Sequence, residues 1–246
     1  MERVVPTGHV FVIFEFDNIT RNLFNNQTLQ SIAEYKKVWV SGMHDGYITI
    51  SAHLHSEMLV VQFKSAGAFP FFHFPLIEIK DKVISGEEIF GKEIVDLRNR
   101  MLAAEETEAK FQLVDKWLMD RYDERKTASR DLLVFIDKLR EEPVCKLKQI
   151  IKTYPSTQKQ LILHFKKYLG VTPKHYQRIM RFNEILKSIQ SKEKISWADI
   201  AYNCDYSDQS HFIKEFFFFS GLNPQEFIRK NLSPEEYTFI PINTKG

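Results

Sequence analysis

The sequence has little cysteine and no long apolar run. Its 246 residues contain two cysteines, Cys145 and Cys204, and neither stands in a pair spacing such as C-x-x-C. Neither a zinc site nor a disulfide framework is therefore indicated. No apolar run reaches the roughly 18 residues that cross a bilayer, and the first residues do not resemble a signal peptide. We expect a protein of the reducing cytoplasm that has no membrane segment.

Sequence signatures of catalysis are also missing. We find no nucleophile elbow, P-loop or dinucleotide fingerprint, so the sequence favours a protein that is not an enzyme and binds no cofactor. One alternative stays open. His53 and His55 would point to one face of a strand and could ligate a metal, with His44 or His73 as a third ligand. No carboxylate is spaced with them, so an enzyme built on such a metal site is the least favoured hypothesis.

Charge is unevenly distributed along the chain. The formal net charge is +2, but residues 1–126 carry 15 Lys and Arg against 19 Asp and Glu, whereas residues 127–246 carry 19 against 13. A basic second half suits contact with a polyanion. Chance surface composition explains the asymmetry equally well.

The first 90 residues are rich in β-branched and aromatic residues. Strands are predicted at 9–16, 38–40, 47–53 and 58–63, with turn signals at Ser41-Gly42 and Asp45-Gly46. In the third of these strands Ile48, Ile50 and Ala52 share one face. These strands indicate a small sheet or barrel-like domain. The aromatic run at 69–75 either lines an apolar ligand pocket or forms a seam against the helices that follow, and we favour the seam.

Helical periodicity begins near residue 86. Apolar stripes predict helices over 89–102 and 111–122, and amphipathicity makes residues 89–122 a candidate surface for homodimer formation. The segment 123–128 is polar and is the expected linker. A helix around 132–139 follows, and residues 144–231 then read as one helix after another.

Capping signals divide this last region. Thr157 is expected to cap a helix over 158–169 that Gly170 ends, and Thr172 and Pro173 to open a long helix reaching about residue 190. A helix over 197–204 follows. Ser207 or Asp208 should cap the next helix at 209–220, which ends at Gly221. Pro224 opens a final helix, and 233–246 reads as a polar tail.

A spacing occurs twice in this region. Phe216-x4-Gly221-x2-Pro224-x2-Phe227 repeats Phe165-x4-Gly170-x2-Pro173-x2-Tyr176 at a displacement of 51 residues. Each copy ends a helix-turn-helix unit, whose second helix enters the DNA major groove by its N-terminal end. Residues 143–231 also hold 15 Lys and Arg against 7 Asp and Glu, a surplus that phosphate neutralisation requires. Two ordinary helical hairpins are the alternative, which the repeat and the caps disfavour.

Residues 129–232 resemble the DNA-binding domain of the AraC/XylS family of bacterial transcription regulators. The matching residues are Lys159-x-Leu161-x3-Phe165-x4-Gly170-Val171-Thr172-Pro173-Lys174-x-Tyr176, Arg181-Phe182, and Ile200-Ala201-x4-Tyr206-x-Asp208-Gln209-Ser210-His211-Phe212-x-Lys214-x-Phe216-x4-Gly221-x2-Pro224-x2-Phe227. The resemblance implies two helix-turn-helix units on a long helix, which read successive major-groove turns. The residues we expect at the DNA are Thr157, Gln158, Lys159, Gln160, Ile162, Leu163, Lys174, Arg178, Ser207, Gln209, Ser210 and Lys214.

The chain departs from the family pattern in three places. Ile162 and Leu163 stand where many members carry Gln and Arg, so they offer contact to thymine methyl groups instead of bidentate hydrogen bonds. Asp205 replaces the usual turn glycine. Phe217 and Phe218 replace residues that are usually charged. This aromatic pair is either a docking surface for the N-terminal domain or a partner, or it is locally repacked.

Residues 4–122 resemble, more weakly, a sensor domain of such regulators, through Val5-Pro6-x-Gly8-His9, Gln62-Phe63-Lys64-x2-Gly67-Ala68-Phe69-Pro70-Phe71 and the segment 97–118. The usual lead-in before Pro-x-Gly is missing, so a truncated sensor or a later start codon is expected. The resemblance implies sensing of a ligand or signal without identifying it.

The predicted fold class is α+β. We expect a β-rich sensor domain at 1–122 with two following helices, a linker at 123–128, an all-α double helix-turn-helix domain at 129–232 and a tail at 233–246. The predicted function is a sequence-specific DNA-binding transcription regulator. Its expected partners are promoter DNA, RNA polymerase and a small-molecule effector. The alternative is a protein-binding regulatory module that has lost base reading.

Overall fold

Two antiparallel sheets form the N-terminal domain. The structure, a computed structural model, describes residues 1–190, 197, 206, 208–230, 232–233 and 235–242. One sheet has the strand order β4-β3-β6-β1-β9 and the other the order β7-β2-β5-β8. The strands are β1 (Glu2–Val4), β2 (Val10–Glu15), β3 (Arg21–Phe24), β4 (Ser31–Tyr35), β5 (Val38–Ser41), β6 (Ile48–Ile50), β7 (Met58–Phe63), β8 (Val83–Ser85) and β9 (Phe239–Pro241). The four predicted strands correspond to β2, β5, β6 and β7.

Strand β2 is buried on both faces, which explains its nearly continuous apolar sequence. Val12 and Phe14 face a core shared with helices, whereas Ile13 packs with Trp39 and Val83 on the opposite face, toward the other sheet. Successive side chains of a strand point to opposite faces. This strand therefore separates the helical layer from the space between the sheets.

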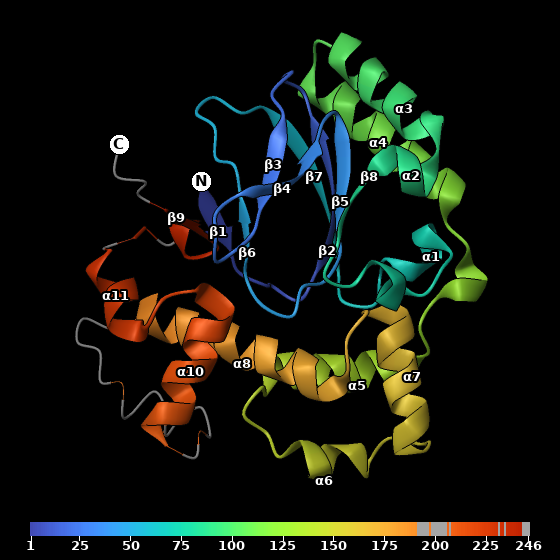
Figure 1. The fold of residues 1–246 in the computed structure, drawn as a ribbon. Coiled ribbons are helices and arrows are strands. Elements are labelled where there is room, and N and C mark those ends of the chain that lie inside the picture. Colours follow the sequence, from blue (N-terminus) through green and yellow to red (C-terminus); the bar gives the residue numbers. More distant parts are fainter. Residues whose placement is uncertain (191–196, 198–205, 207, 231, 234, 243–246) are drawn as a thin grey trace.

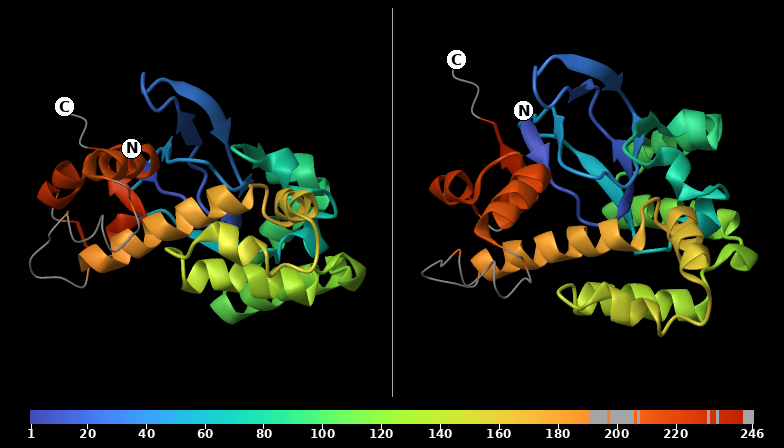
Figure 2. Two further views of the ribbon diagram at one scale, coloured as in Figure 1. Left: turned by 90° about the horizontal axis from the view of Figure 1, so that it is seen from below. Right: turned by 60° about the horizontal axis from the view of Figure 1, so that its bottom comes forward.

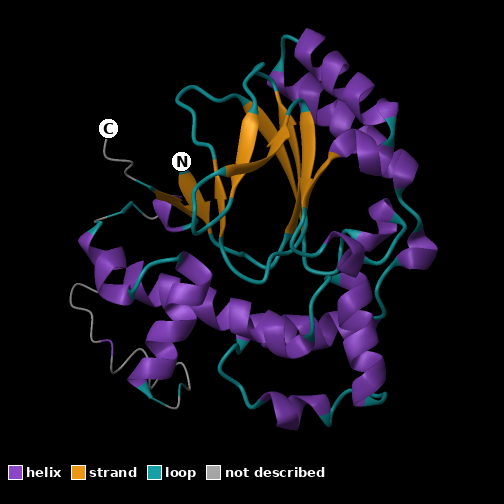
Figure 3. Ribbon diagram, viewed as in Figure 1, coloured by secondary structure: helices purple, strands orange, loops and turns teal. Residues whose placement is uncertain are grey.

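Helices cover the outer face of the second sheet, as Figure 3 shows. They are α1 (Phe69–Phe72), α2 (Gly86–Phe90), α3 (Lys92–Ala103) and α4 (Thr107–Arg121), with a 3-10 turn η1 (Leu76–Ile79). Ile94, Leu97 and Met101 of α3 are fully buried in this core. The amphipathic stripe that suggested a dimer surface is thus used within the chain, and dimer formation through residues 89–122 stays a prediction.

The aromatic run at 69–75 forms a seam against these helices, as favoured from the sequence. The Phe72 ring meets the rings of Phe63 and Phe90 at centroid distances of 5.5 and 5.0 Å. None of its residues lines the cavity described below, so the ligand-pocket interpretation of this run is wrong.

The C-terminal domain is built on one long helix. Its elements are η2 (Glu124–Lys126), α5 (Arg130–Glu141), α6 (Leu147–Ile151), α7 (Gln158–Tyr168), α8 (Pro173–Gln190), α10 (Gln209–Ser220), α11 (Pro224–Arg229) and η3 (Glu235–Tyr237). Figure 2 shows α8 running beneath the sheets with α7 near one end and α10 near the other. Apart from Trp197, which is helical, the predicted helix at 197–204 and the substituted turn residue Asp205 lie outside the described residues.

The C-terminal segment returns to the N-terminal domain. Strand β9 pairs antiparallel with β1, so that Arg3 lies opposite Ile240, and Ile240 is fully buried. The expectation of a polar tail is wrong for residues 239–241, because a run of three residues is too short to show strand periodicity. The chain after the helix-turn-helix domain is thereby fixed to the first sheet.

Candidate nucleic-acid interface and cavity

The first helix-turn-helix unit has the predicted cap and core. Thr157 Oγ1 accepts a hydrogen bond from Gln160 N at 3.2 Å, which pairs one of the free N–H groups at the start of α7. Leu161 and Phe165 are fully buried. Gly170 adopts a positive φ of 83° just after the helix, a conformation that favours glycine. The cap, the buried inner residues and the terminal glycine form the frame of the unit, and they determine which side of α7 faces outward.

The outward side of α7 carries polar residues in its first turn and apolar residues beyond it. Gln158, Lys159 and Gln160 are exposed. Leu163 is 49% exposed and Ile162 is half-buried. The helix therefore offers hydrogen-bonding groups at its tip and a methyl-bearing patch half-way along.

The second unit repeats this frame. Asp208 Oδ1 accepts from His211 N at 2.8 Å, which makes Asp208 the cap of α10. Phe212, Phe216 and Phe219 are fully buried on the inner side. Gly221 ends the helix with a φ of 69°. The repeated spacing in the sequence therefore corresponds to a repeated local structure.

The first two turns of α10 present three polar side chains outward. Gln209, Ser210 and Lys214 are exposed over the first two turns, as predicted from the sequence. Ser207 lies outside the described residues. Gln and Lys side chains are suited to the acceptor and donor groups of adenine and guanine in the major groove.

The two candidate reading helices point the same way. Figure 1 shows the N-terminal ends of α7 and α10 on the side of the molecule turned away from the sheets. Between them α8 has 18 residues, so at about 1.5 Å per residue it spans roughly 27 Å. Adjacent major-groove faces of B-DNA recur about every 34–36 Å. The length of α8 is thus somewhat shorter than this repeat.

Arg178 does not join this outward surface. Its Nε donates to Glu215 Oε2 at 2.9 Å, and its guanidinium lies 5.1 Å from the centroid of the Phe218 ring. Arg178 thus packs between α8 and α10, and its contact with DNA stays a prediction. Lys174, at the start of α8, is exposed.

Glu215 is a buried carboxylate that the sequence alone did not single out. It is 5% exposed and accepts hydrogen bonds from Arg178 and from Tyr206 Oη, the latter at 3.0 Å. Arg181 Nη2 lies 3.7 Å from the same carboxylate. A buried carboxylate requires such partners. The sequence signal for this site was a charged residue, Glu215, between the buried positions Phe212 and Phe216 of an amphipathic helix.

The exposed aromatic residues Phe217 and Phe218 differ in their surroundings. Phe217 is 53% exposed and Phe218 is 42% exposed. Phe218 lies at the N-terminal domain, because a Cβ added to Gly46 would come within 2.8 Å of the Phe218 carbonyl oxygen. Contact with the N-terminal domain, one of the two interpretations of this pair, thus applies to Phe218.

A polar bridge joins the two domains at this place. His175 Nε2, near the start of α8, lies 3.1 Å from both the backbone oxygen and the carboxylate of Asp45. Lys80 Nζ donates to the same Asp45 carboxylate at 2.6 Å. Burial lowers the pKa of His175, an effect that the Asp45 carboxylate opposes. The loop at 42–47 therefore connects the sheets to α8 and α10.

A cavity of about 290 Å³ lies between the two sheets. Its apolar wall includes Phe11, Ile13, Leu23, Ile48, Ile50 and Val60. The shared face predicted for Ile48 and Ile50 is thus a wall of the cavity. Thr238 and Phe239 of the C-terminal segment also line it, as do Gly42, Met43 and His44 of the bridging loop.

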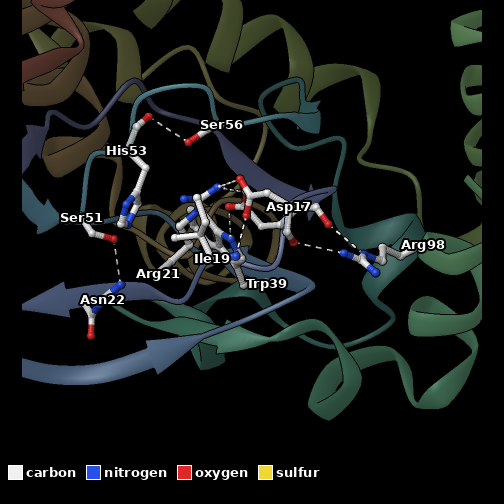
Figure 4. A network of polar contacts seen from close by, with 10 residues as sticks. Asp17, Ile19, Arg21, Asn22, Trp39, Ser51, His53, Ser56 and Arg98 are labelled. Atoms are coloured by element: carbon white, nitrogen blue, oxygen red, sulfur yellow. Dashed lines mark hydrogen bonds and ion pairs between the residues drawn. The ribbon is translucent and has the colours of Figure 1, made fainter. Parts of the chain in front are cut away.

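A charged cluster closes one end of this cavity. Glu15 is fully buried and accepts from Arg21 Nη2 at 2.6 Å and from Trp39 Nε1 at 2.9 Å. Arg21 also donates to Asp17 at 2.6 Å, and Arg98 of α3 donates to the backbone oxygens of Glu15 and Asp17. Figure 4 shows Arg21 between His53 and Asp17. The acidic residue inside an otherwise apolar strand was the sequence signal for this cluster.

The histidines considered as metal ligands do not form a cluster. His53 and His55 follow the end of β6 instead of alternating along it, and both are exposed. The residues that the structure describes contain no group of three or more His, Cys, Asp or Glu that could hold a metal ion. Among the described helices, none is long and apolar enough to cross a membrane.

Comparison with known proteins identifies two segments. Residues 155–230 match a family described as a helix-turn-helix domain, and residues 1–85 match a family described as a domain of unknown function, DUF6597. The chain matches no curated protein.

Solved structures of ToxT from Vibrio cholerae are distantly similar. ToxT of strain O395 is 12% identical, with 93% of each chain covered and a TM-score of 0.46. A second ToxT structure, at 1.65 Å resolution, is 10% identical over 93% of this chain and 94% of that one, with a TM-score of 0.47. Wild-type ToxT of strain SCE256 bound to an unsaturated fatty acid is 12% identical over 92% and 90%, with a TM-score of 0.46.

Proposed function

We propose that this chain, whose residues 155–230 form an AraC-type helix-turn-helix domain, is a sequence-specific DNA-binding transcription regulator controlled by a small molecule. The observation that carries the proposal is the pair of capped helices with exposed polar tips at the two ends of α8. Both tips face away from the sheets (Figure 1). Two such tips on one face suit two successive major-groove turns.

Different residues fix the position of the protein on the DNA and read the bases. Lys and Arg of this basic region neutralise phosphates and fix the position of the protein on the duplex. Gln209 and Lys214 of α10, and Gln158 and Lys159 of α7, present hydrogen-bonding groups to base edges. Leu163, exposed half-way along α7, adds contact with thymine methyl groups. The second unit accordingly contributes more hydrogen-bonded specificity, and the first more methyl and shape contact.

The cavity between the sheets is the proposed effector site. Most of its exposed wall is apolar, and polar side chains from several strands and loops also line it, a combination typical of small-molecule sites. Loop 42–47 and the C-terminal segment both line it, and both belong to the junction with the helix-turn-helix domain. A bound effector that favours one arrangement of the loop would shift the populated orientation of α8 and α10.

The first test of the function is DNA binding by the full chain. Fluorescence anisotropy with labelled promoter fragments should show affinity that falls steeply and linearly on a plot of log K against log salt. An unrelated duplex at the same salt should bind more weakly. Failure to bind any duplex at low salt would contradict the proposal.

A protein-binding regulatory module is the second candidate, favoured by one observation. Ile213 is 38% exposed and Phe217 53% exposed on α10, beside the polar tip. An apolar surface of this kind suits a protein partner such as RNA polymerase. Phe217→Ala separates the candidates: a regulator that reads DNA keeps its DNA affinity, whereas a protein-binding module loses its partner.

A further inference from the structure

The two candidate reading helices share one pair of outward residues. At the displacement of 51 residues that relates the two units, a glutamine and the isoleucine four residues after it are the same in both helices. These residues are Gln158 and Ile162 in α7 and Gln209 and Ile213 in α10. The other outward positions differ, as Lys159 and its counterpart Ser210 do. The pair is therefore common to two helices whose remaining outward side chains are different.

The pair occupies the same place in each unit, because the local frames are equivalent. The caps Thr157 and Asp208 correspond at the same displacement, and so do the glycines that end the helices. The buried inner residues also correspond, namely Leu161, Phe165 and Tyr168 in α7 and Phe212, Phe216 and Phe219 in α10. The shared glutamine and isoleucine therefore lie on the same side of each helix.

The shared side chains reach the surface of the protein. Gln158 and Gln209 are exposed, Ile213 is 38% exposed, and Ile162 is half-buried. Residues four apart on a helix are neighbours, with Cβ atoms about 5–6 Å apart. Successive bases of a DNA strand lie about 3.4 Å apart along the axis. The glutamine and the isoleucine of one helix therefore span about one to two base steps.

We infer that both reading helices recognise the same short element, an adenine and a thymine within two base pairs of each other. The glutamine amide pairs with N7 and the N6 amino group of the adenine, and the isoleucine contacts the C5 methyl group of the thymine. The two halves of the bound site share this element and differ where the remaining side chains read. The inference rests on the proposed DNA-binding function and describes the sequence of the partner.

Ile213 is thereby assigned to base reading, beside Gln209, Ser210 and Lys214. An isoleucine side chain has no hydrogen-bonding group, so it distinguishes bases by contact with the methyl group that only thymine presents in the major groove. Phe217 is also exposed on α10, but a lysine stands at the corresponding position of α7. Phe217 is therefore not part of the shared element.

Removal of single groups from the DNA tests the inference on the full chain. Selection from a random duplex library first yields a preferred duplex. Replacing thymine by deoxyuridine then removes one methyl group, and replacing adenine by 7-deazaadenine removes the N7 acceptor. Fluorescence anisotropy should find one sensitive adenine and one sensitive thymine at the same spacing in each half of the site. Different spacings, or a half that lacks either sensitive base, would overturn the inference.

Two isoleucine variants assign the methyl contacts. Deoxyuridine at a shared thymine should weaken binding of the unaltered chain roughly threefold to fivefold, the effect of about one buried methyl group. Ile213→Ala should abolish this penalty in one half of the site, and Ile162→Ala in the other. Ile32→Ala, the same change at a 60% exposed position of β4, should leave both penalties in place.

Each penalty is a ratio of two affinities measured with one variant, so a general loss of stability does not imitate the result. If Ile213→Ala left both penalties unchanged, the inference would be wrong. Ile213 would then belong to the apolar surface that suits a protein partner.

Two glutamine variants assign the adenine contacts. 7-Deazaadenine at a shared adenine should weaken binding of the unaltered chain roughly threefold to tenfold, the effect of about one hydrogen bond. Gln158→Ala should abolish this penalty in the half affected by Ile162→Ala, and Gln209→Ala in the half affected by Ile213→Ala. A glutamine and an isoleucine of one helix that act in opposite halves would contradict the shared element.

Binding to the starting library separates this inference from the proposed function. A chain that retains no duplex overturns the regulator function, and the shared element with it. A chain that selects two halves without a common element overturns the shared element alone and leaves the regulator function standing.

Discussion

Tyr154 and His164 of the first helix-turn-helix unit form a hydrogen bond of 2.8 Å, where the second unit has Tyr206 and Glu215 joined at 3.0 Å. His164 and Glu215 correspond at the displacement of 51 residues that relates the two units. The imidazole bonds a tyrosine of its own unit. The carboxylate also binds Arg178 and lies near Arg181, both on α8.

This difference extends to the contacts with the N-terminal domain. The end of α7 packs closely on backbone, since a Cβ on Gly170 would lie 2.9 Å from the Leu76 oxygen. The end of α10 meets the polar loop at 42–47, which also lines the cavity. Both ends therefore pack closely on the N-terminal domain, because a Cβ on Gly46 would lie 2.8 Å from the Phe218 oxygen. The end near α10 adds the polar contacts of His175 and Lys80 with Asp45, in a loop that also lines the cavity.

The largest expected effect tests the shared frame. Phe165→Ala and Phe216→Ala each remove a fully buried ring at equivalent positions and should each cost roughly 3–5 kcal/mol of unfolding free energy. Phe217→Ala, at a 53% exposed position, is the control and should change stability by less than about 0.5 kcal/mol. Urea unfolding measures all three. A loss at Phe216 no larger than that at Phe217 would mean that the two units are not built alike.

The next effect separates charged from neutral fixation. Glu215→Gln leaves Arg178 without a carboxylate partner and should cost about 2–3 kcal/mol, since the pair is buried on the Glu215 side and the Arg178 side chain keeps 28% of its exposure. His164→Gln removes the hydrogen bond with Tyr154 and should cost about 1 kcal/mol. The unfolding free energies of the two variants, measured in low and high salt, check this prediction. Equal losses for the two variants would remove the contrast between the units.

A third prediction concerns base reading. Lys214→Ala and Lys159→Ala remove exposed groups from equivalent faces, and each should cost roughly 1–3 kcal/mol on the preferred sequence. Leu163→Ala should weaken only sequences with thymine at the contacted step. Anisotropy titrations on specific and random duplexes measure the difference. If a lysine variant weakened both duplexes by the same factor, that lysine would be a phosphate contact.

The smallest effect is a pH dependence on the α10 side. His44 lies in the bridging loop, and burial lowers its pKa from the ordinary value of 6.5 to about 4, against the raising effect of Asp81 and Asp45. Between these values the unfolded chain binds the proton and the folded chain does not, so stability falls as the pH falls from 6.5 toward 4.

Because His44 is half-buried, we expect this contribution to be about 1–2 kcal/mol after screening. His44→Asn should reduce the pH dependence of unfolding over that range, and His55→Gln, at an exposed position, should leave it unchanged. A pH dependence that survives in His44→Asn would assign it to another group.

The sequence predicted local structure well where one element determines it. The cap at Thr157, the helix ends at Gly170 and Gly221, and the inward phenylalanines follow from spacing within a single helix. Asp208 was one of two candidate caps, beside Ser207. The strands β2, β5, β6 and β7 showed apolar or alternating patterns of sufficient length.

The sequence could not predict contacts between distant segments. Strand β9 is three residues long and exists because β1 lies beside it. The bond from Arg178 to Glu215 could not be predicted, because it depends on how α10 packs against α8. Arg21, Glu15 and Trp39 come from three strands, and only the closed sheets bring them to one end of the cavity.

The most direct measurement is selection of bound sequences from a random duplex library by the full chain, Lys159→Ala and Lys214→Ala. We predict two short motifs whose centres lie about one helical turn apart, with Lys159→Ala relaxing one motif and Lys214→Ala the other. The Lys214→Ala loss should fall on a guanine position. A single motif, no enrichment at all, or relaxation of both motifs by either variant would contradict two separate reading helices on one DNA face.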